Sequence, residues 1–265
     1  MSWTLLRATI HQRRTSVFWF SFGLVLYAWL MTWFWPQMGG DKYAELIESY
    51  PPELLQLFGG TEVPMASLGG YFQMEYLGLM WMLIVASALI IYAAKAFSGE
   101  IGAGTMEFTL AQPVSRVRLA VTRVIAMAGY VVVLAIASFV PIMIFGPQYD
   151  IELSAKTYVL LMSFGGLFML AIGGIAMLLS SMFRDGGKPG SIAAGILVLF
   201  WIADLVANAS EAAEFFEPVN LVSYWQPGKI INDGTVAAEA WWIYAAVALV
   251  TLVGAVVVFS RRDVA

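Results

Sequence analysis

The sequence predicts an all-α polytopic membrane protein, with six transmembrane helices in a single domain over residues 1–265. Two features of its composition predict this fold class: 60% of the residues are apolar, and only 12% are charged. That charged fraction is about half the value of a soluble domain, and it could not cover a soluble protein's surface. The ten Trp residues, many of them near the ends of apolar runs, suit the interfaces of a bilayer.

Apolar runs that are long enough to cross a bilayer define the six spans. A hydrocarbon core of about 30 Å needs about 20 helical residues. The fifth run contains Asp204, and an aspartate at the centre of a helix costs roughly 3 kcal/mol of membrane-insertion free energy. The Leu, Ile, Val and Phe residues of the same run roughly offset that cost. The predicted spans are residues 17–35, 77–94, 124–145, 158–182, 192–207 and 240–259.

The distribution of basic residues predicts the orientation of these spans. Eleven of the 14 Lys and Arg residues lie in the N-terminal segment, the 95–123 loop, the 184–188 turn and the C-terminal segment. The alternate segments hold the other three, Lys42, Lys156 and Lys229. Because cytoplasmic loops are enriched in Lys and Arg, both termini are expected in the cytoplasm. A five-span arrangement would break this pattern.

The N-terminal segment is expected to be an amphipathic elbow helix over residues 2–14, lying on the cytoplasmic surface. Its polar face carries His11, the only histidine, which we interpret as an interfacial residue in water. The apolar run that follows, 17–35, is longer than a usual signal-peptide core and lacks a small-x-small cleavage site, so we expect an uncleaved span. We expect an integral protein of a prokaryotic cytoplasmic membrane.

Few side chains are available for catalysis or for metal binding. The chain has no cysteine and one histidine, so it offers no thiolate site, no His-rich metal cluster and no cysteine nucleophile. Acidic residues inside or beside a span are functional candidates by default. Glu75 and Asp204 are the two in this position, and they either line a transport pathway or are interfacial groups in water.

The segments on the other side of the membrane are expected to contain short helices. Residues 43–50 have a helical pattern, Pro51–Pro52 interrupts it, and residues 53–58 precede the Gly59–Gly60 stop. Residues 208–239 are expected to form an outer helix and loop.

The loop between the second and third spans, residues 98–116, carries the strongest local signals. A glycine-loosened turn from Glu100 to Gly104 is followed by Thr105, a good helix N-cap. A short amphipathic helix then presents apolar side chains and a carboxylate on the cytoplasmic side, where it would need a partner groove. The loop's candidate residues are Glu100, Gly104, Thr105, Met106, Glu107, Phe108, Leu110, Pro113 as helix stop, Ser115 as the next N-cap and Arg116 at the phosphate level.

Two other interpretations of this loop are a phosphate-binding loop and a solvated turn. A phosphate-binding loop needs Gly-x4-Gly-Lys-Ser/Thr after a strand. Neither Gly-Lys pair of the chain fits, because Gly187–Lys188 precedes Pro189 and Gly228–Lys229 precedes Ile230. We therefore expect no nucleotide hydrolysis by this chain. The other interpretation is a solvated turn with capping residues, and it stays open.

The loop resembles the coupling helix of the membrane subunits of type 2 ATP-binding-cassette exporters. The shared pattern is Glu100-x3-Gly104-Thr105-x-Glu107-x2-Leu110-x2-Pro113-x-Ser115-Arg116. The resemblance covers the whole chain, from the elbow helix through an outer loop at Tyr50–Gly59 to the closing Phe259–Asp263. Arg123 departs mildly from it, since relatives often have Lys there.

The resemblance implies a permease that moves a drug, lipid or hydrophobic peptide out of the cell. Its partners would be two cytoplasmic ATPase subunits, which would bind the ATP and Mg²⁺, a second permease chain (identical or similar) and the bilayer, with no nucleic acid. The alternatives are an energy-independent channel or secondary carrier, an intramembrane enzyme, and a non-transporting membrane anchor or regulator of an ATPase.

Overall fold

The computed structural model describes residues 3–38, 45, 49, 64, 66–209 and 218–262. This part of the chain contains helices and no strand, and six of its helices are long and apolar enough to cross a membrane. The all-α fold class and the six spans are therefore confirmed. The spanning helices are α1 (Trp3–Met38), α5 (Leu79–Ala96), α8 (Arg116–Phe145), α9 (Ala155–Met182), α10 (Gly187–Ala209) and α12 (Ala238–Arg261).

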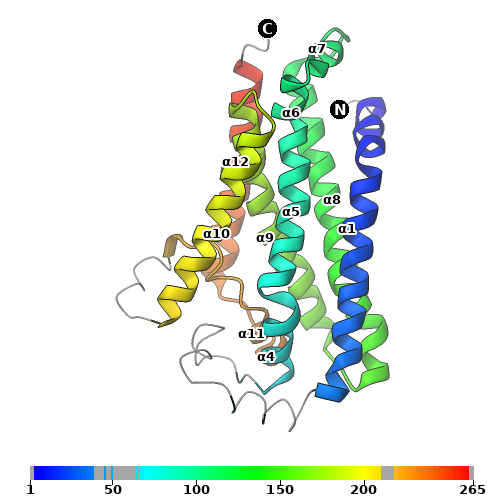
Figure 1. Ribbon diagram of the computed structural model, residues 1–265, viewed down its shortest axis with the longest axis vertical. Coiled ribbons are helices and arrows are strands. Elements are labelled where there is room, and N and C mark those ends of the chain that lie inside the picture. The colour runs from blue at the N-terminus through cyan, green and yellow to red at the C-terminus, as the bar shows by residue number, and fades with distance from the viewer. Residues whose placement is uncertain are drawn as a thin grey trace.

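The six helices run lengthwise through the molecule, and both chain termini lie at the same end (Figure 1). That end also carries two short helices, α6 (Ser98–Gly102) and α7 (Thr105–Leu110), and we call it the α7 end. The opposite end, called the α11 end, carries α4 (Leu68–Tyr71) and α11 (Pro227–Asp233). Because the basic residues predict a cytoplasmic location for both termini, the α7 end is the predicted cytoplasmic end.

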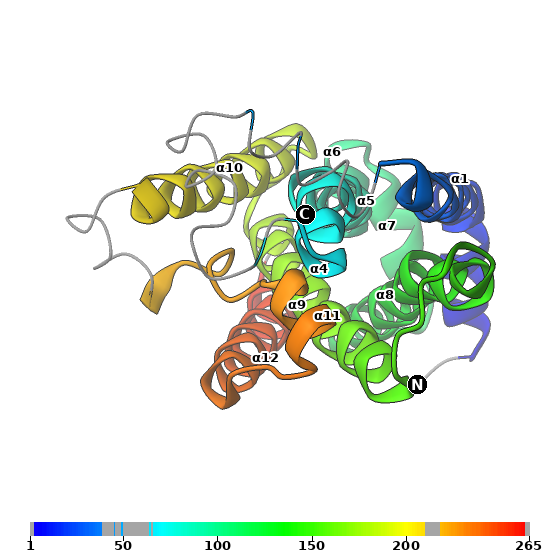
Figure 2. The same cartoon turned by 90° about the horizontal axis from the view of Figure 1, so that it is seen from below.

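The spans form a buried inner group and an exposed outer group. Helix α9 lies in the middle of the bundle and packs against α5, α8, α10 and α12 (Figure 2). We compared the buried share of the apolar 18-residue stretch in each span. It is 50–56% in α5, α8 and α9, and 17–22% in α1, α10 and α12. The outer three helices therefore present apolar faces that suit lipid or a second protein chain.

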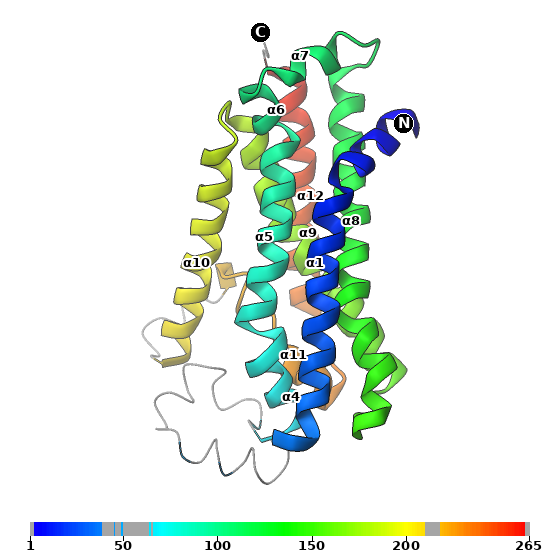
Figure 3. The ribbon, with the colours of Figure 1, turned by 45° about the vertical axis from the view of Figure 1, so that its right-hand side comes forward.

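The predicted elbow helix is continuous with the first span. Helix α1 runs unbroken from Trp3 to Met38, and its first turns bend away from the axis of the remainder (Figure 3). A single helix forms because no Gly occurs before Gly23 and no Pro before Pro36, so nothing in the sequence breaks the hydrogen-bond ladder.

The second span begins later than the predicted residue 77. A π-helix, η1 (Phe72–Leu77), follows α4, and α5 starts only at Leu79. The third span is longer than predicted, because α8 starts at Arg116 and continues through Pro141 to the 3₁₀ turn η2 (Gly146–Tyr149). Apart from residues 45 and 49, the helices expected over 43–50 and 53–58 lie outside the described residues, and so does the acidic part of 208–239.

Stacked aromatic rings close the core near the α11 end. The rings of Trp81 and Trp225 stack with centroids 4.8 Å apart, and Phe168 stacks on both. Both indoles are satisfied: Trp81 Nε1 donates to Ser138 Oγ at 2.9 Å and Trp225 Nε1 donates to the Leu77 carbonyl at 2.8 Å. The loop that carries Trp225 is thereby fixed to the inner helices.

Candidate functional site

The predicted loop forms two short helices that cap the α7 end of the bundle (Figure 3). They meet at Gly104, whose φ of 70° lies in the left-handed region, where a residue without a side chain is favoured. The amide of Gly104 donates to the Ile101 carbonyl at 3.0 Å, which closes the turn. The direction of α7 is therefore set by one left-handed residue between two helices.

The capping predictions had different outcomes. The prediction that Thr105 is the N-cap is wrong: Gly104 holds that position, and the Thr105 hydroxyl donates to the Glu100 carbonyl at 3.3 Å. The prediction for Ser115 is confirmed, since its Oγ accepts from the Arg118 amide at 3.2 Å at the start of α8. Pro113 lies in the connection after α7 ends at Leu110.

Helix α7 buries one face and exposes the other. Met106, expected to face outward, is only 1% exposed and belongs to the core. Phe108 is 77% exposed, Glu107 beside it is exposed, and Leu110 is half-buried against the core. Glu107 and Phe108 together form what we call the α7 tip.

An ion pair attaches α6 to α8. Arg123 Nη2 lies 2.5 Å from Glu100 Oε2, and the two side chains are only 6% and 18% exposed. The Arg123 guanidinium also lies over the Phe97 ring, 5.6 Å from its centroid. Glu100 therefore acts inside the protein, whereas the sequence placed it among residues available to a partner.

A second attachment joins the start of α6 to α9. The Ser180 hydroxyl accepts from the amides of Phe97 and Ser98, at 3.3 and 3.2 Å. The close approach of the neighbouring turn requires a glycine at Gly102, because an added Cβ would lie 2.9 Å from the Arg184 carbonyl. The sequence does not distinguish Ser180, because it is one of three serines in the apolar span 158–182.

Arg262 makes a third attachment at the same end. Its Nη1 donates to the carbonyls of Ser181 and Phe183 at 2.9 and 2.8 Å, at the end of α9. Its own carbonyl accepts from Arg116 Nη1, at the start of α8. Burial, and secondarily the nearby Arg184 charge, lower the pKa of the Arg262 guanidinium. Arg262 thus ties α8, α9 and α12 together at the α7 end.

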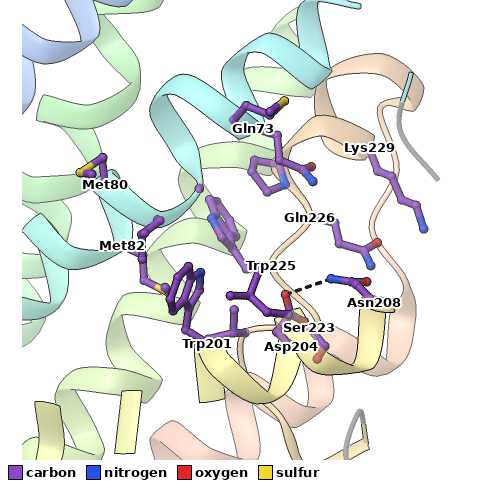
Figure 4. A pocket seen from close by; sticks show the side chains of 16 residues that line it. Gln73, Met80, Met82, Trp201, Asp204, Asn208, Ser223, Trp225, Gln226 and Lys229 are labelled. Atoms are coloured by element: carbon purple, nitrogen blue, oxygen red, sulfur yellow. Dashed lines mark hydrogen bonds between the residues drawn. The ribbon is translucent and has the colours of Figure 1, made fainter. Parts of the chain in front are cut away.

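A pocket opens near the α11 end between α10, η1 and the loop after residue 218 (Figure 4). Its volume is about 230 Å³. Apolar side chains line one part of it, including Met82, Trp201 and Trp225, and polar side chains line another. A pocket of this size is below the usual range for a drug-sized ligand.

The two acids predicted as pathway residues do not lie together. Asp204 lines this pocket, where Asn208 Nδ2 donates to its Oδ2 at 3.5 Å (Figure 4). Glu75 is exposed on η1 and is absent from the pocket lining; its backbone carbonyl accepts from the Tyr27 hydroxyl of α1. The pocket instead brings Lys229 of α11 to the same cavity as Asp204. No pattern in the sequence predicts that Asp204 and Lys229 share a pocket, because only the fold of the outer loop brings them together.

The fold is a polytopic helical bundle with a short helix pinned across one end and connected to three inner spans, which is the architecture of a membrane domain. A comparison with protein families identifies the family to which this membrane domain belongs. Residues 8–264 match the ABC-2 family transporter protein model, so the chain belongs to that family. It is the membrane domain of an ATP-binding-cassette transporter, a class that works with an ATP-binding subunit. A comparison with curated proteins gave no match.

Proposed function

We propose that this chain is the permease subunit of an exporter that two separate ATPase subunits drive from the α7 end. The chain contributes half of the substrate pathway, as a homodimer or with a similar second chain. ATP and Mg²⁺ bind to the ATPase subunits. The substrate is a drug, a lipid or a hydrophobic peptide, for which the apolar spans provide a compatible path.

The exposed α7 tip is the observation that carries this proposal. A phenylalanine that is 77% exposed at the predicted cytoplasmic end gains about 1.5–3 kcal/mol when a partner covers it fully. The adjacent carboxylate of Glu107 adds a charge that a basic group on the partner can recognise. An apolar anchor beside a charge is the kind of feature that fits into a groove on another protein.

The attachments of α6 and α7 support a role in transmitting movement. The Glu100–Arg123 pair links α6 to α8, and Ser180 links it to α9. Helix α6 also follows directly from α5. A displacement of α7 on closure of the ATPase pair is therefore passed to α5, α8 and α9, the three inner spans.

The exposed outer helices support assembly with a second permease chain. Helices α1 and α10 carry large apolar side chains on their outer faces, such as Phe22 at 50% exposure and Leu199 at 66%. Lipid covers such faces in a monomer. In the proposed dimer, one of these faces is buried against the second chain, and the substrate pathway lies between them.

The central test is to replace Glu107 by Arg in the full complex. We expect ATPase docking to weaken by roughly tenfold to a hundredfold, because a like charge then faces the partner's basic group. Folding is expected to be unaffected, because the Glu107 side chain is exposed. ATPase co-purification and ATP-driven transport in proteoliposomes are the measurements.

A matched control is Glu152→Arg, the same charge reversal at another exposed residue. Glu152 lies in the connection between η2 and α9, at the end of the bundle opposite α7. This variant should dock the ATPase and transport normally. Phe108→Ala should weaken docking without any change of charge. Unchanged docking and transport in both α7 tip variants would overturn the proposal, and so would robust transport by the purified chain without an ATPase subunit, which indicates a channel or secondary carrier.

A further inference from the structure

A second cavity lies at the α7 end, away from the α7 tip, between the start of α1, the end of α5 and the middle of α8. Its volume is about 310 Å³. The side chains that line it are mostly polar, basic or aromatic rather than aliphatic: Gln12, Arg13, Thr15, Ser16, Trp19, Ile91, Tyr92, Lys95 and Tyr130. We call it the α1–α5 pocket.

The charge around this pocket is positive. Arg13 and Lys95 line it directly. The charged groups that interact with Arg13 from neighbouring elements are Arg123 and Glu100, and these two already form an ion pair with each other. The two lining cations are therefore left to attract an anion.

Two hydrogen-bonding groups at this pocket are buried without a partner among the described residues. One is Arg13 Nε and the other is the hydroxyl of Tyr130. Arg13 Nη2 is used, since it donates to the Lys95 carbonyl at 2.9 Å. Ser16 is the polar group beside the Tyr130 hydroxyl, but the two do not reach hydrogen-bonding geometry. A buried donor without an acceptor is costly, so a bound oxyanion would satisfy both groups.

The surface beside the pocket is apolar and exposed. Trp19 lies at the pocket and is 62% exposed. Its ring contacts those of Phe18 and Phe22, with centroids 5.3 and 6.1 Å away, and these two are also largely exposed. The aromatic group continues from the pocket along α1 toward the middle of the span. A ligand with an anionic head and an apolar tail matches both parts.

We propose that the α1–α5 pocket binds the phosphate of an anionic phospholipid from the leaflet at the α7 end. The phosphate oxygens accept from Arg13 and from the Tyr130 hydroxyl, Lys95 adds a second positive charge, and the acyl chains lie on the aromatic face of α1. A volume of about 310 Å³ suits a headgroup rather than a whole lipid, which leaves the chains outside the pocket. Basic pockets between spans on the cytoplasmic side are known to hold such headgroups.

The test measures lipid binding to the purified full chain by native mass spectrometry, during titration with phosphatidylglycerol or phosphatidylcholine. We expect wild type to prefer phosphatidylglycerol. Arg13→Gln should weaken its binding by about tenfold, since a charge-assisted hydrogen bond is lost. Lys95→Gln should weaken it by about fivefold through the lost charge. The measurement needs no ATPase and no transport, so it is independent of the proposed function.

Arg14→Gln is the matched control. Arg14 carries the same charge, follows Arg13 in the sequence, is exposed and does not line the pocket. It should keep the preference for phosphatidylglycerol. Since Arg13 also binds the Lys95 carbonyl, its variant could be unstable; Tyr130→Phe removes only a hydroxyl and should still weaken binding by about threefold. Equal effects of Arg14→Gln and Lys95→Gln, or an unchanged preference in Lys95→Gln and Tyr130→Phe, would overturn the proposal. Displacement of the lipid by excess inorganic phosphate would instead assign the pocket to free phosphate.

Discussion

Replacing Glu100 by Ala should destabilise the protein more than replacing Arg123 by Met, although each change removes the same ion pair. Arg123 is the more deeply buried partner, with a side chain 6% exposed compared with 18% for Glu100. Its Nη1 is already buried without a partner among the described residues. Removal of Glu100 therefore leaves a charged guanidinium with neither terminal nitrogen paired to an acid. Such a loss costs about 3–5 kcal/mol.

The Arg123→Met variant leaves a different residue unpaired. Glu100 is closer to water and can be hydrated, and a Met side chain keeps the apolar contact over Phe97, where the guanidinium now lies. We expect a cost of about 1.5–3 kcal/mol, the range of one lost hydrogen bond to a charged group. The double variant should be less destabilised than the sum of the two, with a coupling of about 1–3 kcal/mol.

The assay is unfolding by sodium dodecyl sulfate in mixed micelles, followed by tryptophan fluorescence, for wild type, both single variants and the double variant. Arg118→Met is the control, because Arg118 lies on the same helix and is exposed; it should stay within about 0.5 kcal/mol of wild type. The reasoning is refuted if Glu100→Ala costs less than Arg123→Met, or if the two single effects add.

Two further predictions concern glycines. Gly104→Ala should destabilise α7 by about 1 kcal/mol, because a φ of 70° disfavours a side chain. Gly129→Ala, inside α8, should instead stabilise the protein by up to about 1 kcal/mol, although at both positions an added Cβ has nothing within 4 Å. Thermal unfolding of both variants measures the two effects, and effects of the same sign would contradict the prediction. Gly174→Ala should separate α9 from α12, because the added Cβ would lie 2.2 Å from Thr251 Oγ1, at a cost of about 1–3 kcal/mol. A Thr251→Ala change in the same chain should recover most of that stability, and failure to recover any would mean that the backbone, rather than the hydroxyl, limits the approach.

The six spans could be predicted because bilayer thickness fixes the length of an apolar run, and a run of that length has few other uses. The Ser115 cap could be predicted for a similar reason, since a hydroxyl before a helix has one common role there. Asp204 in the fifth span was placed correctly as a residue of a helix, α10, and it now lines a pocket. These are local properties, which neighbouring residues determine.

The burial of Met106 and the pairing of Glu100 could not be predicted in the same way. In a helix of six residues, periodicity does not say which face turns inward, so Met106 and Phe108 looked equivalent. The Glu100–Arg123 and Arg116–Arg262 contacts join residues 23 and 146 positions apart, and they depend on how the helices pack. Thr105 is the first residue of α7 and not its cap, because the left-handed Gly104 turns the chain directly into the helix.

The contacts of Arg262 have a consequence for the order of events during biosynthesis. Helices α6 and α7 leave the ribosome long before Arg262, whose contacts with Arg116, Ser181 and Phe183 complete the α7 end of the bundle. Pairing over such a sequence separation is slow and comes late in folding. Until translation reaches that arginine, α8, α9 and α12 lack their common tie at this end. A partner that recognises the finished α7 end would therefore select chains that include Arg262 over shorter nascent ones.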